Sequence, residues 1–210
     1  MQQAKFITLE GIEGVGKSSN LIFLLQLLKE KNIPFCQTRE PGGTPLGEQL
    51  RALLLAPTEQ GMGSNTELLL MFAARAEHLH ALIQPELKKG NWVVSDRFTD
   101  ASYAYQGGGR GISKQRILAL EAWLQEGFQP DLTLLLDAPP EVGLARVSQR
   151  GASDRFEQEQ VSFFQRVREA YLERAEREPE RFRLINADQP LFAVQAEIKA
   201  ALMPFLSRAV

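Results

Sequence analysis

A glycine-rich segment near the N-terminus has the residue types and spacing of a phosphate-binding loop. The chain reads Gly11-Ile12-Glu13-Gly14-Val15-Gly16-Lys17-Ser18-Ser19, which contains a full match to the pattern G-x-x-x-x-G-K-[ST] between a β-prone run and a helical one. Glycines let backbone N–H groups surround a polyphosphate, and the N-terminus of the following helix adds a partial positive charge. Lys17 can reach the β- and γ-phosphates, and the Ser18 hydroxyl can bind Mg²⁺. The segment therefore predicts a site for a nucleoside triphosphate.

Two arginines follow other β-prone runs of the chain. Arg39 comes after the second run, and Arg97 comes directly after the third. Because the carboxyl ends of parallel strands meet at one edge of a sheet, both arginines should face the crevice beside the glycine-rich loop. The planar guanidinium suits bidentate binding of a phosphate, so the two arginines predict a second anion next to the triphosphate. Each could instead form a structural ion pair, with Glu40 or with Asp96.

Three acids could lie near a bound Mg²⁺. Asp96 and Asp137 each end an apolar run, and either could bind the ion directly or through water. Asp96 is preferred because Arg97 is beside it, whereas Asp137 could simply cap the next helix. Glu13 lies inside the phosphate loop, where a carboxylate is unfavourable unless it meets Mg²⁺, another cation or a substrate hydroxyl.

Phe72 and Arg75 share one face of a predicted helix, because they are three residues apart. An aromatic ring beside a forked donor can stack on a nucleobase and bond its carbonyl group. Phe72 lies in an apolar run, so a place in the core is the alternative. His78 and His80 are two residues apart and point to different faces, so we expect packing roles rather than a metal pair.

A second group of polar side chains precedes a run of three glycines. Ser102, Tyr105 and Gln106 could bond a base or a sugar, and Gly107-Gly108-Gly109 predicts a flexible loop after them. A surface turn that joins two helices is the alternative.

A cationic segment over residues 146–157 has the composition of a lid. It contains Arg146, Arg150 and Arg155, which could act as arginine fingers supplied by the same chain. The alternative is a solvated charged face. That second interpretation is the one expected for the arginines further along the chain: Arg166, Arg168, Arg174 and Arg177.

Alternating β-prone and helical segments supply the frame that must position these residues. Five short β runs separated by helices predict a single α/β domain over residues 1–210, with a mostly parallel sheet covered on both faces. The predicted strands are 5–10, 33–38, 91–96, 131–137 and 181–186. The predicted helices are 17–31, 45–56, 65–89, 99–106, 113–126, 140–149, 156–177 and 190–208.

Composition narrows the class of protein. The 210 residues are 44% hydrophobic and 24% charged, which suits one globular domain. A net charge of -2 does not suggest a nucleic-acid-binding surface, and the single cysteine allows no internal disulfide. The first strand begins almost at once, and no apolar stretch reaches the ~20 residues of a membrane span. We therefore expect no signal peptide, no membrane partner and a cytoplasmic location.

The ordered motifs resemble the thymidylate kinase family of P-loop nucleoside-monophosphate kinases, and the resemblance covers essentially the whole chain. They are Glu10-Gly11 to Ser18, Arg39-Glu40-Pro41-Gly42-Gly43-Thr44, Phe72-Ala73-Ala74-Arg75, Asp96-Arg97-Phe98, Tyr105-Gln106 to Gly111, and Arg150 with Asp154-Arg155-Phe156-Glu157. The resemblance implies a three-layer P-loop NTPase fold with a five-stranded parallel sheet. It also implies Mg²⁺-ATP as donor, dTMP as acceptor and a homodimer.

The resemblance also implies roles for individual residues. Residues 11–19 would bind the ATP phosphates, and Ser18 and Asp96 would lie at Mg²⁺. The catalytic residues would be Lys17, Arg97 and Glu13, together with Arg150 and Arg155 of the lid. In the dTMP site, Phe72 would stack on thymine and Arg75 would bond its carbonyl. The other dTMP-binding residues would be Glu13 at the 3′-hydroxyl, Arg39 and Arg97 at the phosphate, Pro41, Ser102, Tyr105 near the deoxyribose, and Gln106.

Gly14 stands where some family members carry an arginine. With Arg146, Arg150 and Arg155 nearby in the lid, this resembles the bacterial subclass in which the lid supplies the catalytic cation. Two other functions remain open: a kinase for another nucleotide or deoxynucleoside, and a regulatory NTP-binding switch. The two arginines beside the loop argue against a switch, since a switch needs no site for an acceptor phosphate.

Overall fold

The computed structural model describes residues 3–56, 61–148 and 155–206. Within them, five strands form one sheet: β1 (Phe6–Glu10), β2 (Phe35–Arg39), β3 (Trp92–Asp96), β4 (Leu132–Asp137) and β5 (Phe182–Asn186). Their order is β2-β3-β1-β4-β5, and each neighbouring pair runs parallel. The predicted five-stranded parallel sheet is confirmed, with the second strand two residues later than its predicted start.

The strand that leads into the glycine-rich loop lies at the centre of the sheet. β1 is buried along its whole length, and β4 is buried except at its last residue, because helices cover both faces of a parallel sheet. The register pairs Leu9 of β1 with Asp96 of β3, and Asp96 with Arg39 of β2. The ends of three neighbouring strands therefore meet at one edge.

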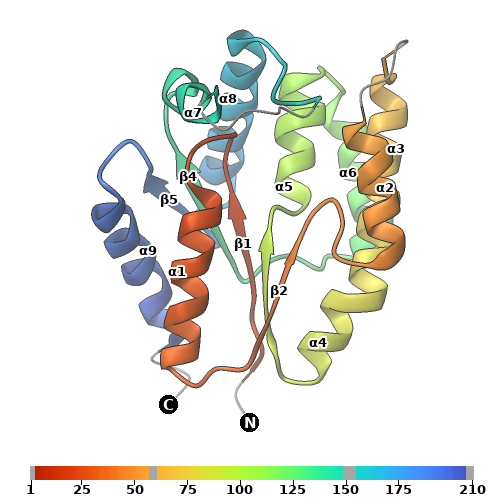
Figure 1. The fold of residues 1–210 in the computed structure, drawn as a ribbon. Helices are drawn as coiled ribbons and strands as arrows, with labels where there is room; N and C mark the ends of the chain where they lie inside the picture. Colours follow the sequence, from red (N-terminus) through yellow and green to blue (C-terminus); the bar gives the residue numbers. More distant parts are fainter. Residues whose placement is uncertain (1–2, 57–60, 149–154, 207–210) are drawn as a thin grey trace.

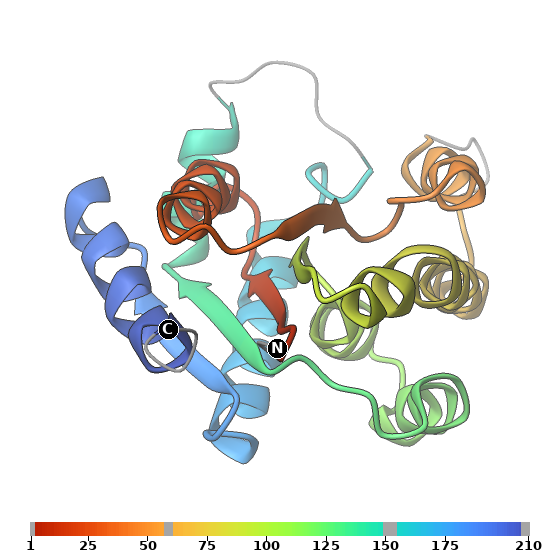
Figure 2. The same ribbon diagram turned by 90° about the horizontal axis from the view of Figure 1, so that it is seen from below.

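Helices cover both faces of this sheet, as Figures 1 and 2 show. α1 (Lys17–Glu30) and α9 (Leu191–Leu206) lie together on one face, and α8 (Val161–Arg177) packs on the other face with the π-helical segment η2 (Tyr103–Gly109). The remaining helical segments are α2 (Pro45–Leu55), α3 (Ser64–His78), η1 (Leu79–Ile83), α4 (Gln84–Lys88), α5 (Thr99–Ser102), α6 (Lys114–Gln125) and α7 (Pro140–Ser148). This three-layer α/β arrangement confirms the predicted fold class.

The run of three glycines is helical, so the prediction of a flexible loop is wrong. Gly107–Gly109 forms the end of η2, which packs closely against α8. A methyl group added at Gly108 would lie 2.6 Å from the Arg166 carbonyl oxygen and 2.7 Å from Cβ of Ala170. These glycines therefore permit close contact between two helical segments.

The start of one predicted helix also differs from the structure. The helix predicted from residue 156 begins at Val161, after a stretch of turns over residues 155–160.

In the described part of the chain, no helix is both long enough and apolar enough to cross a membrane.

Candidate active site

The glycine-rich loop joins β1 to α1 and has the backbone of a phosphate-binding loop. Gly11, Gly14 and Gly16 all have positive φ angles, which glycine adopts without the strain that a side chain would bring. A side chain at Gly14 would overlap the carbonyl oxygen of Gly143 in α7. The loop backbone therefore packs directly against that helix.

Lys17 points back into this loop. Its Nζ donates to the carbonyl oxygens of Gly11 at 3.0 Å and Ile12 at 2.8 Å. Burial, together with the charge of Arg97, lowers the pKa of Lys17 from 10.5 to about 8. The ammonium group thus lies where a triphosphate would stabilise its charged form.

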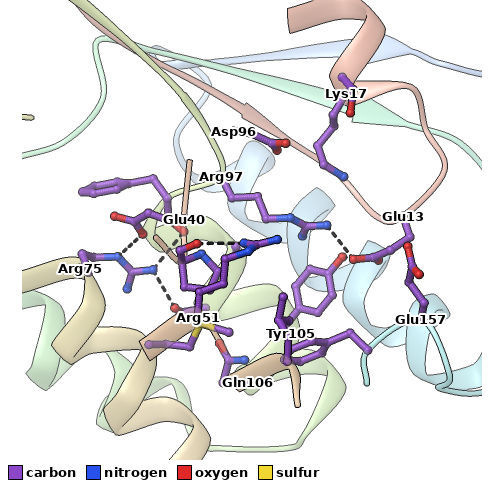
Figure 3. A pocket seen from close by; sticks show the side chains of 18 of the residues that line it. Glu13, Lys17, Glu40, Arg51, Arg75, Asp96, Arg97, Tyr105, Gln106 and Glu157 are labelled. Carbon is purple, nitrogen blue, oxygen red and sulfur yellow. Dashed lines mark hydrogen bonds and ion pairs between the residues drawn. The ribbon is translucent and has the colours of Figure 1, made fainter. Parts of the chain in front are cut away.

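A cavity of about 270 Å³ lies against the loop (Figure 3). Side chains from positions as far apart in the chain as Glu13 and Glu157 line it, so distant motifs in the sequence converge here. Its lining includes seven of the predicted dTMP-binding residues: Glu13, Pro41, Arg75, Arg97, Ser102, Tyr105 and Gln106. Lys17, Ser18 and Asp96 line the same cavity from the side of the loop.

Arg97 holds an ion pair at the centre of the cavity. Its Nη2 lies 2.7 Å from Glu13 Oε1, and the Tyr105 hydroxyl donates to Glu13 Oε2 at 2.5 Å. The guanidinium also lies over the Tyr105 ring, 4.6 Å from its centroid. Arg97 has a φ of 72°, a left-handed conformation that costs a non-glycine residue of order 1 kcal/mol. The cation that Glu13 requires is therefore Arg97, and Asp96 is not the partner of this arginine.

Glu10, the buried last residue of β1, lies next to the segment that carries Arg97. Its carboxylate accepts from the backbone N–H of Phe98 and from the Tyr171 hydroxyl, both at 2.7 Å. Burial raises the pKa of Glu10, and the nearby Asp100 adds to the increase. Sequence reasoning assigned no role to Glu10 or Tyr171, although the position of Glu10 at a strand end was a usable signal.

Arg75 lies on the opposite wall and is 2% exposed. Its Nε donates to Glu40 Oε2 at 2.8 Å, and its Nη2 donates to Ser102 Oγ at 3.0 Å and to the Phe98 carbonyl oxygen at 3.2 Å. Its Nη1 is buried and has no hydrogen-bond partner among the described residues. Arg75 lines the cavity, and since buried donors are normally satisfied, the unpartnered Nη1 is the donor of this side chain that is left for a ligand.

Asp96 has a carboxylate oxygen that is suited to bind a metal ion. Its Oδ1 is buried without a hydrogen-bond partner in the described part of the chain, and it lines the cavity with Ser18. Asp137 is engaged elsewhere, because both of its oxygens accept from Arg168 at 2.7 Å. No group of three or more His, Cys, Asp or Glu side chains able to hold a metal occurs in the described residues. Ser18 and Asp96 therefore suit Mg²⁺, which commonly takes one or two protein oxygens beside substrate phosphates and water.

Arg39 and Phe72 do not line this cavity. Arg39 is about half exposed and forms an ion pair with Glu48 at 2.8 Å, beside a second cavity of about 450 Å³ that it shares with Ser18 and Asp96. Phe72 is buried against Leu68 in the core, and the Arg75 guanidinium lies 4.6 Å from its ring centroid.

The lid arginines are only partly described. Arg150 lies outside the described residues. Arg155 forms an ion pair with the buried Glu67 at 2.7 Å and donates to the Leu54 carbonyl oxygen at 3.0 Å. Arg146 reaches the phosphate loop, with Nη1 3.4 Å from the Gly14 carbonyl oxygen.

The expectation of a solvated face for the downstream arginines is wrong for two of them. Arg168 binds Asp137, and Arg174 forms an ion pair with the buried Asp100 at 3.0 Å. Arg51 of α2 lines the cavity, but no motif in the sequence marked it. The two pairings depend on contacts of α8 with β4 and with α5, which spacing along one helix does not reveal.

The sheet order, the loop and the cationic cavity together define a P-loop nucleotide-binding protein. A family model described as Thymidylate kinase matches residues 9–198. The chain is 58% identical over 203 residues to the thymidylate kinase of Pseudomonas entomophila (strain L48), with 97% of each chain covered. It is 56% identical over 209 residues to the thymidylate kinase of Alkalilimnicola ehrlichii, with 99% of this chain and 96% of the relative covered. The chain belongs to the thymidylate kinase family, so the resemblance seen in the motifs is confirmed.

Proposed function

We propose that this protein transfers the γ-phosphoryl group of Mg²⁺-ATP to dTMP, giving dTDP and ADP for dTTP biosynthesis. Membership of the thymidylate kinase family supports this reaction. The observation that carries the proposal is that one cavity is lined by Lys17 of the phosphate loop and by Arg75 and Arg97. A donor and an acceptor can therefore meet in a single cationic space.

On the donor side, backbone N–H groups of residues 11–19 would surround the ATP phosphates. Lys17 would exchange the carbonyl oxygens of the loop for phosphate oxygens. Mg²⁺ would be held by Ser18 and by the unpartnered Oδ1 of Asp96, where it would neutralise phosphate charge.

On the acceptor side, Nη1 of Arg75 would donate to a carbonyl oxygen of thymine, with Ser102 and Gln106 beside it. Arg97 would bind the acceptor phosphate, and Glu13 would then accept from the 3′-hydroxyl of the sugar beside Tyr105. The Arg97–Glu13 pair holds both side chains in position, so binding replaces one partner of each with a group of the substrate. Arg39 would have to leave Glu48 to join them.

The chemistry needs little base catalysis. The acceptor is a phosphate monoester, whose second pKa of ~6 leaves its attacking oxygen largely ionised at neutral pH. Positioning by Arg75 and charge neutralisation by Lys17 and Arg97 would lower the barrier. The lid segment 146–157, with Arg150 and Arg155, would supply a further cation. Arg155 would have to exchange Glu67 for a phosphate.

We also propose that the protein is a homodimer that acts in the cytoplasm, where its nucleotide substrates are used. Exposed large apolar side chains include Leu53 on α2, Leu69 on α3, and Leu118 and Trp123 on α6. Trp123 is 79% exposed, and its burial between two copies would explain the apolar surface. Sedimentation of the wild type and of a Trp123→Lys variant tests this proposal. It predicts that the wild type is a dimer and that the variant dimerises more weakly.

A coupled ADP-release assay tests the reaction itself. The purified protein should consume ATP only when dTMP is present, and more slowly with dUMP, dCMP or thymidine. ATP consumption that does not depend on dTMP would refute the assignment. A regulatory switch would bind ATP but ignore dTMP in calorimetry, whereas a kinase should bind dTMP without ATP.

A further inference from the structure

Four buried side chains form a hydrogen-bonded chain between the end of β2 and Arg75. His78, the last residue of α3, has Nδ1 3.0 Å from Glu40 Oε1 and Nε2 2.6 Å from Thr38 Oγ1. The other oxygen of Glu40 accepts from Arg75 Nε at 2.8 Å. None of the four is more than 7% exposed. His78 does not line the cavity, but it contacts Glu40, which does.

The acceptor at one end of His78 fixes the position of one proton of this chain. A carboxylate can only accept, so the proton between His78 and Glu40 lies on Nδ1. The Thr38 hydroxyl can either donate to Nε2 or accept from it, so it satisfies the second ring nitrogen in both cases. His78 therefore occupies Oε1 of Glu40 and leaves only Oε2 to Arg75.

This division matters because a carboxylate and a guanidinium favour a two-bond fork. Without His78, Oε1 would be buried and unsatisfied, which is costly. Rotation of Glu40 would let that oxygen take Nη2 of Arg75 away from Ser102. The guanidinium would then turn, and the unpartnered Nη1 would change its orientation.

The loop after β2 closes over the same chain. A methyl group on Gly43 would overlap Thr38 Oγ1 and lie 2.6 Å from His78 Nε2. The Thr38–His78 contact thus also supports the segment Glu40–Gly43, whose Pro41 lines the cavity.

We propose that His78 is a positioning residue for the acceptor nucleotide. By holding Oε1 of Glu40, it limits Arg75 to one bond with the carboxylate and keeps Nη1 of Arg75 available to the nucleotide. The inference rests on the proposed function, in which Arg75 binds the base of dTMP.

Two substitutions of His78 separate this role from packing. His78→Asn places an amide N–H near the position of Nδ1 and can still donate to Glu40. His78→Gln places its amide near Nε2, so it fills more of the space but leaves Glu40 Oε1 without its donor. We expect His78→Gln to raise KM for dTMP about tenfold or more, since hydrogen bonds to charged groups have effects of this order. His78→Asn should raise it by about threefold or less, although it leaves the larger cavity and melts at the lower temperature.

Which of the two variants has the higher KM for dTMP decides whether His78 positions Arg75 or only fills space. If KM for dTMP instead follows melting temperature, with Asn worse than Gln, or if KM for ATP rises by the same factor, His78 has only a structural role. A wild type without dTMP-dependent activity would refute the proposed function separately. A crystal structure of His78→Gln, which needs no substrate, then tests the inference: a Glu40–Arg75 fork with Nη2 drawn from Ser102 supports it, and an unchanged Arg75 overturns it.

Discussion

Binding of a nucleoside triphosphate should take up a proton above pH 8, because Lys17 is then largely neutral in the free protein. Burial and Arg97 lower the pKa of Lys17 to about 8. A triphosphate against Nζ favours the ammonium form, so binding raises the pKa again. Only the protonated lysine contributes fully to binding, and linkage therefore makes affinity fall as the pH rises through 8.

The size of the effect follows from that pKa. At pH 9, one unit above it, about nine in ten Lys17 side chains are neutral, and at pH 7 about nine in ten are charged. Binding at pH 9 should therefore take up about 0.9 proton, and affinity should be about tenfold weaker than at pH 7. The phosphates of the nucleotide contribute no proton uptake at pH 9, because the second pKa of a phosphate is ~6.

Calorimetry with a non-hydrolysable ATP analogue measures the uptake. Titrations at pH 9 in two buffers of different ionisation enthalpy give the number of protons directly. Lys17→Arg keeps its charge at pH 9, so its uptake should fall close to zero. Burial also raises the pKa of Glu10 to about 8, so Glu10→Gln is the matched control and should keep most of the uptake. No uptake by the wild type, or equal uptake by Lys17→Arg, would refute the reasoning.

Asp96→Asn should raise the Mg²⁺ concentration for half-maximal rate about 10–100-fold, as losses around metal sites do, and an unchanged Mg²⁺ titration would exclude Asp96 from the site. Phe72→Ala should lower the free energy of unfolding by about 3–5 kcal/mol because the ring is buried. If the ring also stacks on the base, dTMP affinity of the folded variant should fall by about 1–3 kcal/mol in calorimetry. Gly108→Ala should cost about 1–3 kcal/mol in urea unfolding through overpacking against α8. At Gly63 an added Cβ would have its nearest neighbouring atom 3.8 Å away, so Gly63→Ala should lower the free energy of unfolding much less. Equal losses in the two variants would contradict the packing argument.

Local signals carried the predictions that succeeded. The glycine-rich loop is one continuous motif, and alternating strands and helices fixed the sheet because each element has its own periodicity. The convergence of Arg97 with Lys17 followed from the rule that strand ends share one edge of a parallel sheet.

The partners of individual side chains could not be predicted from the sequence, because they depend on contacts between elements that are distant in the chain. Arg39 pairs with Glu48 and not with Glu40, because Glu40 turns inward to Arg75 and His78. Nothing in the order of residues says which of two nearby acids an arginine will meet. The glycines of η2 show the same limit, since glycine permits flexibility and close packing alike, and only the presence of α8 distinguishes them.

The contact between Gly14 and Gly143 links two positions that are far apart in the chain. A side chain at Gly14 would overlap the carbonyl oxygen of Gly143, and one at Gly143 would overlap that of Glu13. An arginine can therefore enter the phosphate loop only if α7 moves away as well. With α7 held this close to the loop, any extra positive charge for the phosphates has to come from outside the loop.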